Sequence, residues 1–230
     1  MKNIVFITGA GVSAESGIST FRDSDGLWEN YPVMEVASHT GFLRNPALVH
    51  EFYNMRRRDL LDKEPNEAHR WIARLEQYFN VYVITQNVDN LHEKGGSSNV
   101  LHLHGELMKV RAMDNENLTF TLDEDNLSTT PDTIIEGHHV RPHIVFFEEA
   151  VPMIEPAIDL VGNADIVIII GTSLNVYPAA GLLRYTRPDA KVYYIDPHPA
   201  VVPPHVTVIA RTATKGMAEL APKLIEESGK

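Results

Sequence analysis

The sequence predicts an α/β fold built around a doubly wound, parallel sheet. Short runs of apolar and β-branched residues recur along the chain, as in strands that are buried on both faces. Helical patterns lie between several of these runs, at residues 66–78 and 214–228, and this alternation favours a parallel sheet covered by helices. The predicted strands are Asn3–Thr8, Val81–Thr85, His143–Phe147, Asp165–Ile170 and Lys191–Ile195.

Two stretches interrupt the alternation of strands and helices. Residues 28–64 read as a helical insert, and residues 106–140 are polar, acidic and rich in turn-forming residues. The segment "NLTFTLD" in the second stretch predicts one short strand. Because the apolar content of that stretch is low, we expect a mobile or strand-poor module.

Composition narrows the classes of function. With 20 basic and 31 acidic side chains, a formal net charge of −11 argues against nucleic acid and anionic membranes as main partners. The sequence contains no run of 18 apolar residues, so we expect no membrane-spanning helix. The strand predicted from residue 3 leaves no room for a charged leader and cleavage site, so we expect no signal peptide. Cysteine is absent, which excludes disulfides and thiolate zinc sites and fits a cytoplasmic location.

The first strand runs into a glycine-rich turn, "TGAGVSAESGISTFRD". Gly9, Gly11 and Ala14 satisfy G-x-G-x-x-A, a spacing that lets the backbone approach a phosphate. A tight turn without a ligand also explains this spacing. No second strand ends in an acidic residue about 20 positions further on, as a dinucleotide-binding dehydrogenase requires. Phe21 and Arg22 follow instead, and the arginine suits a pyrophosphate.

Polar residues stand at the ends of three further strands, where ligands bind in open α/β sheets. Of these residues, the three after the second strand suit hydroxyls and an amide better than a phosphate. Those of the "GTS" turn offer hydroxyl and N–H donors, and the last carboxylate can accept from a ribose hydroxyl. Capping of the following helix is the alternative explanation for any one of them. These residues are Gln86, Asn87 and Asp89, then Gly171, Thr172 and Ser173, then Asp196.

The segment "VLHLHGEL" places His102 and His104 on one side of a strand. Two histidines on one face suggest a metal, but no third ligand lies at helpful spacing, so we expect no metal. His104 directly precedes Gly105 at the strand end. A neutral imidazole there suits a general base near pH 7.

Taken in order, these segments resemble the sirtuin (Sir2-like) family of NAD-dependent protein lysine deacylases. The resemblance rests on "GAGVSAESGISTFR", "QNVDNLHEKGG", "HG", "RPHIVFFEE" and "GTSLNVYPA", and covers residues 3 to about 183, then more loosely the rest. It implies a Rossmann-like NAD-binding domain of residues 1–27, 65–105 and 141–230. Residues 28–64 and 106–140 are then the two inserts of a small domain.

The resemblance also assigns roles to residues of this chain. His104 is the expected catalytic base, which takes a proton from a ribose hydroxyl of NAD. Residues 144–149 and 175–177 are expected to pair with the substrate peptide as a strand, with Phe147 and Val176 along the acyl-lysine tunnel. The expected NAD-binding residues are Gly9, Ala10, Gly11, Phe21, Arg22, Gln86, Asn87, Asp89, Gly171, Thr172, Ser173 and Asp196.

The chain departs from the family pattern at several positions. Ser19 and Glu148 replace a proline and a glycine, and Asp196 stands where asparagine is usual. Asp196 is expected to repel a 2′-phosphate, so we predict a preference for NAD over NADP. The family's zinc-binding cysteines are missing, with Ala112 where the first would stand. We therefore expect no zinc and an activity that resists chelators.

The last pattern concerns the acyl group. In the helical insert, Tyr53 and Arg56 are three residues apart and share a helix face. Y-x-x-R there resembles the signature of sirtuins that remove succinyl, malonyl or glutaryl groups. The other explanation is a solvated helix surface. Expected partners are acyl-lysine proteins or peptides. Plain deacetylation and protein ADP-ribosylation remain the alternative activities, while a dehydrogenase or a non-catalytic NAD sensor fits the motifs less well.

Overall fold

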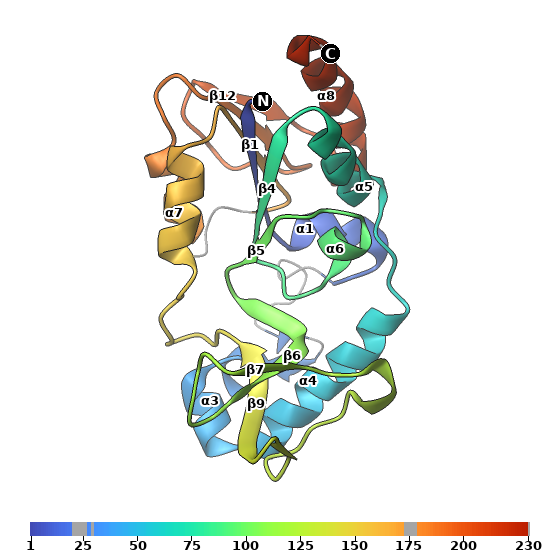
Figure 1. The fold of residues 1–230 in the computed structure, drawn as a ribbon, viewed down its shortest axis with the longest axis vertical. Helices are drawn as coiled ribbons and strands as arrows, with labels where there is room; N and C mark the ends of the chain where they lie inside the picture. The colour runs from blue at the N-terminus through green and yellow to red at the C-terminus, as the bar shows by residue number, and fades with distance from the viewer. Residues whose placement is uncertain (20–26, 29, 173–178, 230) are drawn as a thin grey trace.

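The computed structural model describes residues 1–19, 27–28, 30–172 and 179–229. Its larger sheet has six parallel strands in the order β12-β11-β10-β1-β4-β5 (Figure 1). The strands are β1 (Asn3–Thr8), β4 (Asn80–Thr85), β5 (Val100–His102), β10 (Ile166–Ile170), β11 (Lys191–Ile195) and β12 (Val206–Ile209). The predicted doubly wound α/β fold is therefore confirmed.

The strand order reverses at β1. The chain first adds β4 and β5 on one side of β1, and then β10, β11 and β12 on the other. The carboxyl ends of β1 and β10 flank this switch point, where open parallel sheets bind ligands. The glycine-rich turn after β1 and the "GTS" turn after β10 start at this point.

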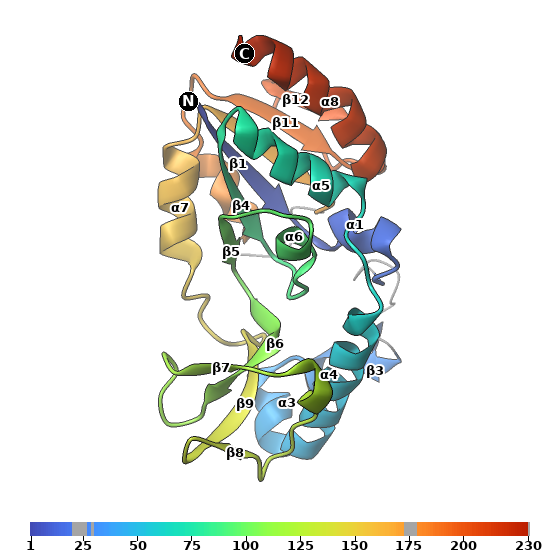
Figure 2. The same ribbon diagram turned by 45° about the vertical axis from the view of Figure 1, so that its right-hand side comes forward.

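Helices cover both faces of the parallel sheet, as Figure 2 shows. On one face α5 (Glu67–Arg74) and α8 (Ala213–Ser228) pack against every second residue of the strands, such as Ile4 and Phe6. On the other face α7 (Ile154–Gly162) packs against Val5 and Ile7. The remaining short helices near this sheet are α1 (Ala10–Ser13), α6 (Leu91–Lys94) and the 3₁₀ turns η1 (Ala14–Ser16), η3 (Leu75–Gln77) and η5 (Ala179–Tyr185).

A second, antiparallel sheet lies at the opposite end of the molecule from α8 (Figure 1). Its strand order is β7-β6-β9-β8. Four buried apolar residues, Val110, Leu122, Leu127 and Val140, form a separate core there. The strands are β6 (Gly105–Ala112), β7 (Thr119–Thr121), β8 (Ile134–Ile135) and β9 (His138–Ile144), with the turn η4 (Glu124–Asn126). We call residues 105–144 the antiparallel module.

The first insert is helical, as predicted. It contains α2 (Val33–Val36), α3 (His39–Arg44) and α4 (Pro46–Leu61), preceded by the two-stranded ribbon β2 (Leu27–Trp28) and β3 (Tyr31–Pro32). Asn45 begins α4 as its N-cap, since its side-chain oxygen accepts from Leu48 N at 3.1 Å. Pro46 follows at the first helical position, where its missing N–H costs no hydrogen bond. The long helix α4 then packs against the antiparallel module.

Two sequence-based expectations are wrong. The run His143–Phe147 does not join the parallel sheet; its first two residues end β9, which pairs antiparallel with β6. An apolar run indicates a strand but not its partner. Residues 106–140 are also not strand-poor, because β6 alone spans eight residues. Polar and charged residues occupy many strand positions there, including the buried Arg111 and Arg141, so low apolar content did not indicate a lack of strands.

Among the described residues, no helix is both long and apolar enough to cross a membrane. The division into an NAD-binding domain and a small domain of two inserts stays a prediction.

Candidate active site

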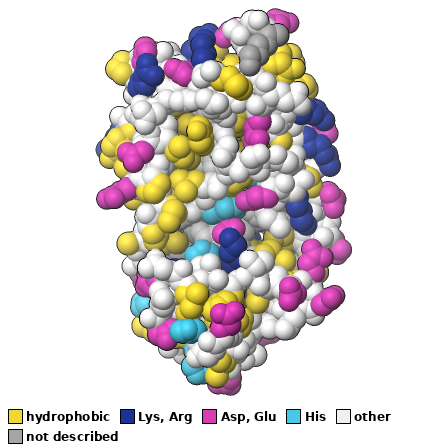
Figure 3. Space-filling view, viewed as in Figure 1, with side chains coloured by type: hydrophobic (Ala, Val, Ile, Leu, Met, Phe, Trp, Pro, Cys, Tyr) yellow, Lys and Arg dark blue, Asp and Glu magenta, His cyan; other side chains and the backbone are white. Residues whose placement is uncertain are grey.

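The carboxyl ends of β1, β4 and β10 open into one cavity of about 530 Å³. Side chains from the parallel sheet, the helical insert and the loop after β9 line it. On the face seen in Figure 3, histidine, acidic and basic side chains gather at mid-height, where the surface is hollowed. Every predicted site residue that the structure describes lines this cavity. These residues are Gly9, Ala10, Gly11, Tyr53, Arg56, Gln86, Asn87, Asp89, His104, Phe147, Gly171, Thr172 and Asp196.

Two glycines bring the loops after β1 and β10 into direct contact. Gly11 N donates to Gly171 O at 2.8 Å. A Cβ on Gly11 would lie 2.6 Å from Gly171 Cα, and Gly171 itself has φ of 61°. No side chain fits between these loops, and only glycine takes this backbone angle without strain. The result is a cradle of bare backbone at the switch point, which fits the diphosphate of a dinucleotide.

A buried hydrogen-bond network fixes the polar residues that follow β4. Asn87 Nδ2 donates to Gly9 O at 3.2 Å and to Ser13 Oγ at 3.2 Å. Ser13 in turn donates to Asp89 Oδ2 at 3.1 Å, and Leu91 N donates to Asp89 Oδ1 at 3.1 Å. Burial raises the pKa of Asp89, and these hydrogen bonds oppose the shift. An amide and a carboxyl group held in fixed orientation are suited to recognising an amide such as nicotinamide.

Residues from both sides of the switch point meet across the cavity. Gln86 Nε2 donates to Thr172 Oγ1 at 3.1 Å, which joins the end of β4 to the end of β10. Asp196, at the end of β11, is 2% exposed, and its Oδ1 accepts from His198 N at 2.8 Å. These positions match the ends of strands at which the sequence placed ribose-binding groups.

His104 lies at the connection between β5 and β6 and lines the cavity. Its Nδ1 lies 3.0 Å from Gln86 O. A carbonyl oxygen can only accept, so Nδ1 carries the hydrogen and Nε2 is left as a proton acceptor. Burial lowers the pKa of His104, although the hydrogen bond to Gln86 raises it in part. The ring is therefore neutral at pH 7, as a general base must be.

The helix α4 brings Tyr53 and Arg56 to one wall of the cavity. The Arg56 guanidinium carbon lies 3.9 Å from the ring centroid of Trp28, a cation–π contact that holds the charge in place. Tyr53 is fully buried, and its hydroxyl has no hydrogen-bond partner among the described residues. Burial raises the pKa of this hydroxyl, so it stays a donor at neutral pH.

The segment after β9 uses its N–H groups within the chain. Val145 N donates to His104 O at 2.9 Å, Phe146 N to Glu149 Oε2 at 2.9 Å, and Phe147 N to Ala37 O at 2.8 Å. These three N–H groups are therefore not free for the strand pairing with a peptide that the sequence predicted along residues 144–149. Glu148, where the family pattern has glycine, keeps a positive φ of 76°.

Four predicted site residues, Phe21, Arg22, Ser173 and Val176, lie outside the described residues. The sequence prediction did not include two residues that shape the site: Ser13, which bonds Asn87 and Asp89, and Trp28, which lines the cavity. Ser13 belongs to the quoted "GAGVSAESG" motif, so its place in a phosphate-loop pattern was a usable signal. Trp28 gives no such signal, because only the fold brings it over Arg56.

The family profile described as "Sir2 family" matches residues 9–178. The chain belongs to the Sir2 family. A protein of Helicobacter pylori (strain ATCC 700392 / 26695) named "NAD-dependent protein deacylase" is 52% identical over 229 residues, which cover 98% of this chain and 99% of the relative. A protein of Bacteroides thetaiotaomicron with the same name is 53% identical over 233 residues, covering 98% and 99%.

A solved complex of a Sir2 homologue with NAD has the same fold. Its TM-score is 0.86 at 36% identity, covering 99% of this chain and 91% of the homologue. These matches confirm the predicted family, enzyme class and co-substrate.

Proposed function

We propose that this Sir2-family enzyme prefers lysines whose acyl group ends in a carboxylate, such as succinyl, malonyl or glutaryl. The chain is an NAD-dependent protein lysine deacylase. The observation that carries the proposal is that Arg56 and Tyr53, from one helix, both line the active-site cavity.

The physical argument concerns the cost of burying a charge. An acyl carboxylate that enters an apolar tunnel loses its water and needs a fixed cation and a donor in return. Arg56 is fixed on Trp28 by a 3.9 Å cation–π contact, and the Tyr53 hydroxyl is buried with no described acceptor. Phe52 and Phe146 pack against Tyr53 at ring distances of 5.1 and 5.9 Å. A neutral acetyl group meets the same apolar wall without using either polar group.

The site geometry also supports proposed roles for the other side chains. NAD, when bound, supplies a reactive ribose carbon and the nicotinamide leaving group. Asn87 and Asp89 are proposed to hold the nicotinamide end, and Gln86 and Asp196 the ribose hydroxyls. His104 Nε2 is the proposed acceptor of a ribose hydroxyl proton, because Nδ1 is committed to Gln86 O at 3.0 Å.

The test is a comparison of kcat/KM on acetyl-, malonyl-, succinyl- and glutaryl-lysine peptides of one sequence. A charged hydrogen bond contributes about 1.5–3 kcal/mol, so Arg56→Met should lower kcat/KM roughly 10- to 100-fold on the three acidic peptides. Tyr53→Phe should act in the same direction, and acetyl-lysine should be nearly unaffected. Arg58→Met is the matched control, because Arg58 is an exposed arginine on the same helix. Equal losses on all four peptides would refute the proposal.

Two further parts of the prediction remain proposals. The buried Asp196 carboxylate is proposed to disfavour the 2′-phosphate of NADP by like-charge repulsion. Equal kcat/KM for NAD and NADP at low cofactor concentration would contradict that role. A cytoplasmic location is proposed from the absence of cysteine alone.

A further inference from the structure

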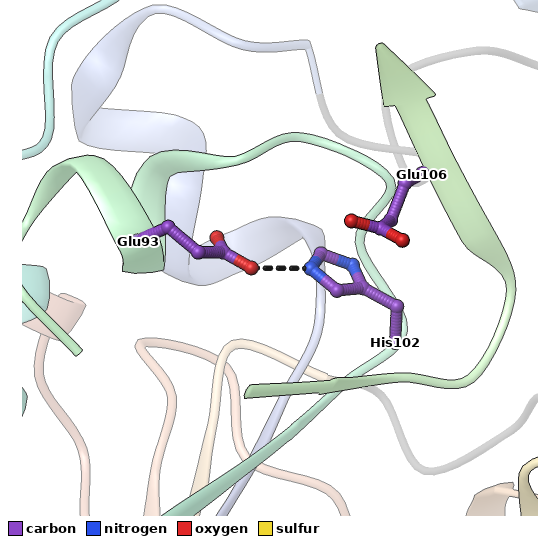
Figure 4. A group of neighbouring side chains, drawn as sticks. All are labelled: Glu93, His102 and Glu106. Atoms are coloured by element: carbon purple, nitrogen blue, oxygen red, sulfur yellow. Dashed lines mark hydrogen bonds and ion pairs between the residues drawn. The ribbon is translucent and has the colours of Figure 1, made fainter. Parts of the chain in front are cut away.

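His102, the last residue of β5, lies in a charged cluster behind the active-site cavity. Figure 4 shows its ring between Glu93 of α6 and Glu106 of β6. The side chain is 8% exposed. Nε2 lies 2.7 Å from Glu93 Oε1, and Nδ1 lies 3.0 Å from Asn87 O. A carboxylate and a carbonyl both only accept, so both ring nitrogens carry hydrogen and the ring is an imidazolium.

The two histidines of "HLH" bind consecutive carbonyl groups. His104 Nδ1 donates to Gln86 O and His102 Nδ1 to Asn87 O, each at 3.0 Å. On the other side of this segment, the Gln86 side chain reaches Thr172 and the Asn87 side chain reaches Gly9. The segment is thus held by two imidazoles, His104 from within the cavity lining and His102 from outside it.

We propose that His102 is a positioning residue for deacylation: Glu93 holds its ring, and its Nδ1–H fixes the Asn87 carbonyl so that the Asn87 amide stays aimed at the nicotinamide end of the site. This inference rests on the proposed role of Asn87 and adds a residue that does not touch NAD. Its effect is expected on the use of NAD and on inhibition by nicotinamide, and not on peptide binding.

The charge on His102 is part of the arrangement. Burial alone would lower the pKa of His102, but the hydrogen bond and charge of Glu93 outweigh it and raise the pKa. When the ring loses one proton, the remaining hydrogen goes to Nε2, because a hydrogen bond to a carboxylate is stronger than one to a carbonyl. Nδ1 then faces Asn87 O lone pair to lone pair. The titratable groups around the ring are Asp89, His92, Glu93, Glu106, Lys109 and His143, and burial lowers the pKa of both His92 and His143.

A bound divalent cation is the competing explanation for the cluster. Glu93, His102 and Glu106 each offer one ligand atom, and these atoms lie within 4.8 Å of one another. However, Glu106 Oε2 is already 2.7 Å from Lys109 Nζ, and His102 Nε2 already bonds Glu93. The cluster is therefore internally neutralised by a lysine and an imidazolium, which favours the positioning role.

Two isosteric substitutions separate the two hydrogen bonds of the ring. The amide nitrogen of asparagine falls near Nδ1 of histidine, and that of glutamine near Nε2. His102→Gln should lose the bond to Asn87 O, lower kcat/KM for NAD about tenfold and weaken nicotinamide inhibition, with KM for the acyl peptide unchanged. His102→Asn should keep that bond and stay within about twofold of wild type. Equal behaviour of the two variants would overturn the proposal.

The pH profile provides a second, independent readout. For wild type, kcat/KM for NAD should fall on the alkaline side as His102 loses its proton. In Glu93→Gln, the new amide can donate to Nε2, so a neutral ring keeps its hydrogen on Nδ1 and this fall should vanish. The same should hold for His102→Asn. If the fall persists unchanged in both variants, His102 is not its source and the proposal fails.

Two controls distinguish a wrong role for Asn87 from a wrong role for His102. If Asn87→Ala keeps wild-type nicotinamide inhibition, the proposed role of Asn87 fails. If Asn87→Ala is impaired and His102→Gln is not, only the positioning role fails. Titration of the wild-type protein with ZnCl₂ and with MnCl₂ by calorimetry is expected to show no binding that depends on His102. One-to-one binding that both His102 variants lose would replace the positioning role by a metal site.

Discussion

The parallel sheet and the antiparallel module are held together by different physical means. In the parallel sheet, all five residues of β10 are apolar and buried, so apolar burial accounts for its stability. The module and the helix packed on it instead bury charge: Arg57 is 0% exposed, and Arg111 and Arg141 are each 7% exposed. Arginines are rarely buried unless their donors are satisfied.

Two networks hold these arginines. Arg57 of α4 donates to Leu107 O at 2.8 Å, to Leu127 O at 3.2 Å and to Asn54 Oδ1 at 2.8 Å. It thereby ties the helical insert to β6 and to the loop after η4.

The second network centres on Glu149. Its carboxylate accepts from Arg141 Nη1 at 2.6 Å and Arg111 Nη2 at 3.3 Å, while Arg141 stacks on Phe146 at 4.0 Å. The comparison teaches that a cysteine-free module can be fixed by directional charge networks.

The largest expected effect lies at His104, where the two regions meet. His104→Ala removes the proposed base, so kcat should fall by about 10²–10⁴ while NAD binding and the unfolding midpoint stay close to wild type. His138→Ala, a histidine of the module far from the cavity lining, is the control and should retain turnover. Deacylation assays measure the fall in kcat, and calorimetric titration with NAD measures cofactor binding. Wild-type turnover in His104→Ala would remove this residue from the mechanism.

The next effect concerns Arg57, the arginine that α4 buries against the module. Arg57→Met leaves two buried carbonyl groups without their donor, so the free energy of unfolding should fall by about 3–5 kcal/mol. Arg58→Met is the matched control, because Arg58 is exposed and donates to the exposed Ser128 Oγ at 3.4 Å. Urea unfolding gives the magnitude, and hydrogen exchange should show the loss of protection first in β6. Equal effects of both substitutions would mean that burial of Arg57 contributes nothing specific.

Substitution of Glu149 should lower the free energy of unfolding by a smaller amount that depends on pH. Burial alone would raise its pKa, but the Arg141 hydrogen bonds and the Phe146 N–H outweigh this and lower the pKa to about 2. Because the folded-state value lies below the unfolded one, this stability is present above pH 4.5 and is lost as the pH falls toward about 2. Glu149→Gln should therefore cost about 3 kcal/mol at pH 7 and progressively less in acid.

The control for Glu149 is its neighbour. Glu148 is exposed, and its carboxylate accepts from Thr40 N at 2.9 Å rather than from a buried arginine. Glu148→Gln should leave the urea midpoint unchanged across the same pH range. A Glu149→Gln cost that does not change with pH would show that the carboxylate charge is not what stabilises the module.

The contrast between apolar burial in the parallel sheet and buried charge networks around the module explains which features the sequence could predict. The strands β1, β4, β10 and β11 follow from local composition, because buried parallel strands need apolar side chains throughout. The face shared by Tyr53 and Arg56 follows from helical spacing. Burial of Arg57 could not be predicted from local sequence, because its acceptors belong to residues 107 and 127, far along the chain. Glu93 is likewise brought to His102 only by tertiary structure.

The smallest expected effect is that of a chelator. The chain has no cysteine, and the arginine networks already connect α4, β6 and β9. Incubation of tag-free protein with EDTA should therefore leave the unfolding midpoint within about 1 °C of the untreated protein, with deacylation unchanged. Arg57→Met is the comparison protein: its lower midpoint should be equally insensitive to EDTA, because the networks and not a metal set the stability of the module. Stoichiometric zinc by elemental analysis, whose removal lowers the midpoint, would show instead that the module depends on a metal despite its lack of thiolates.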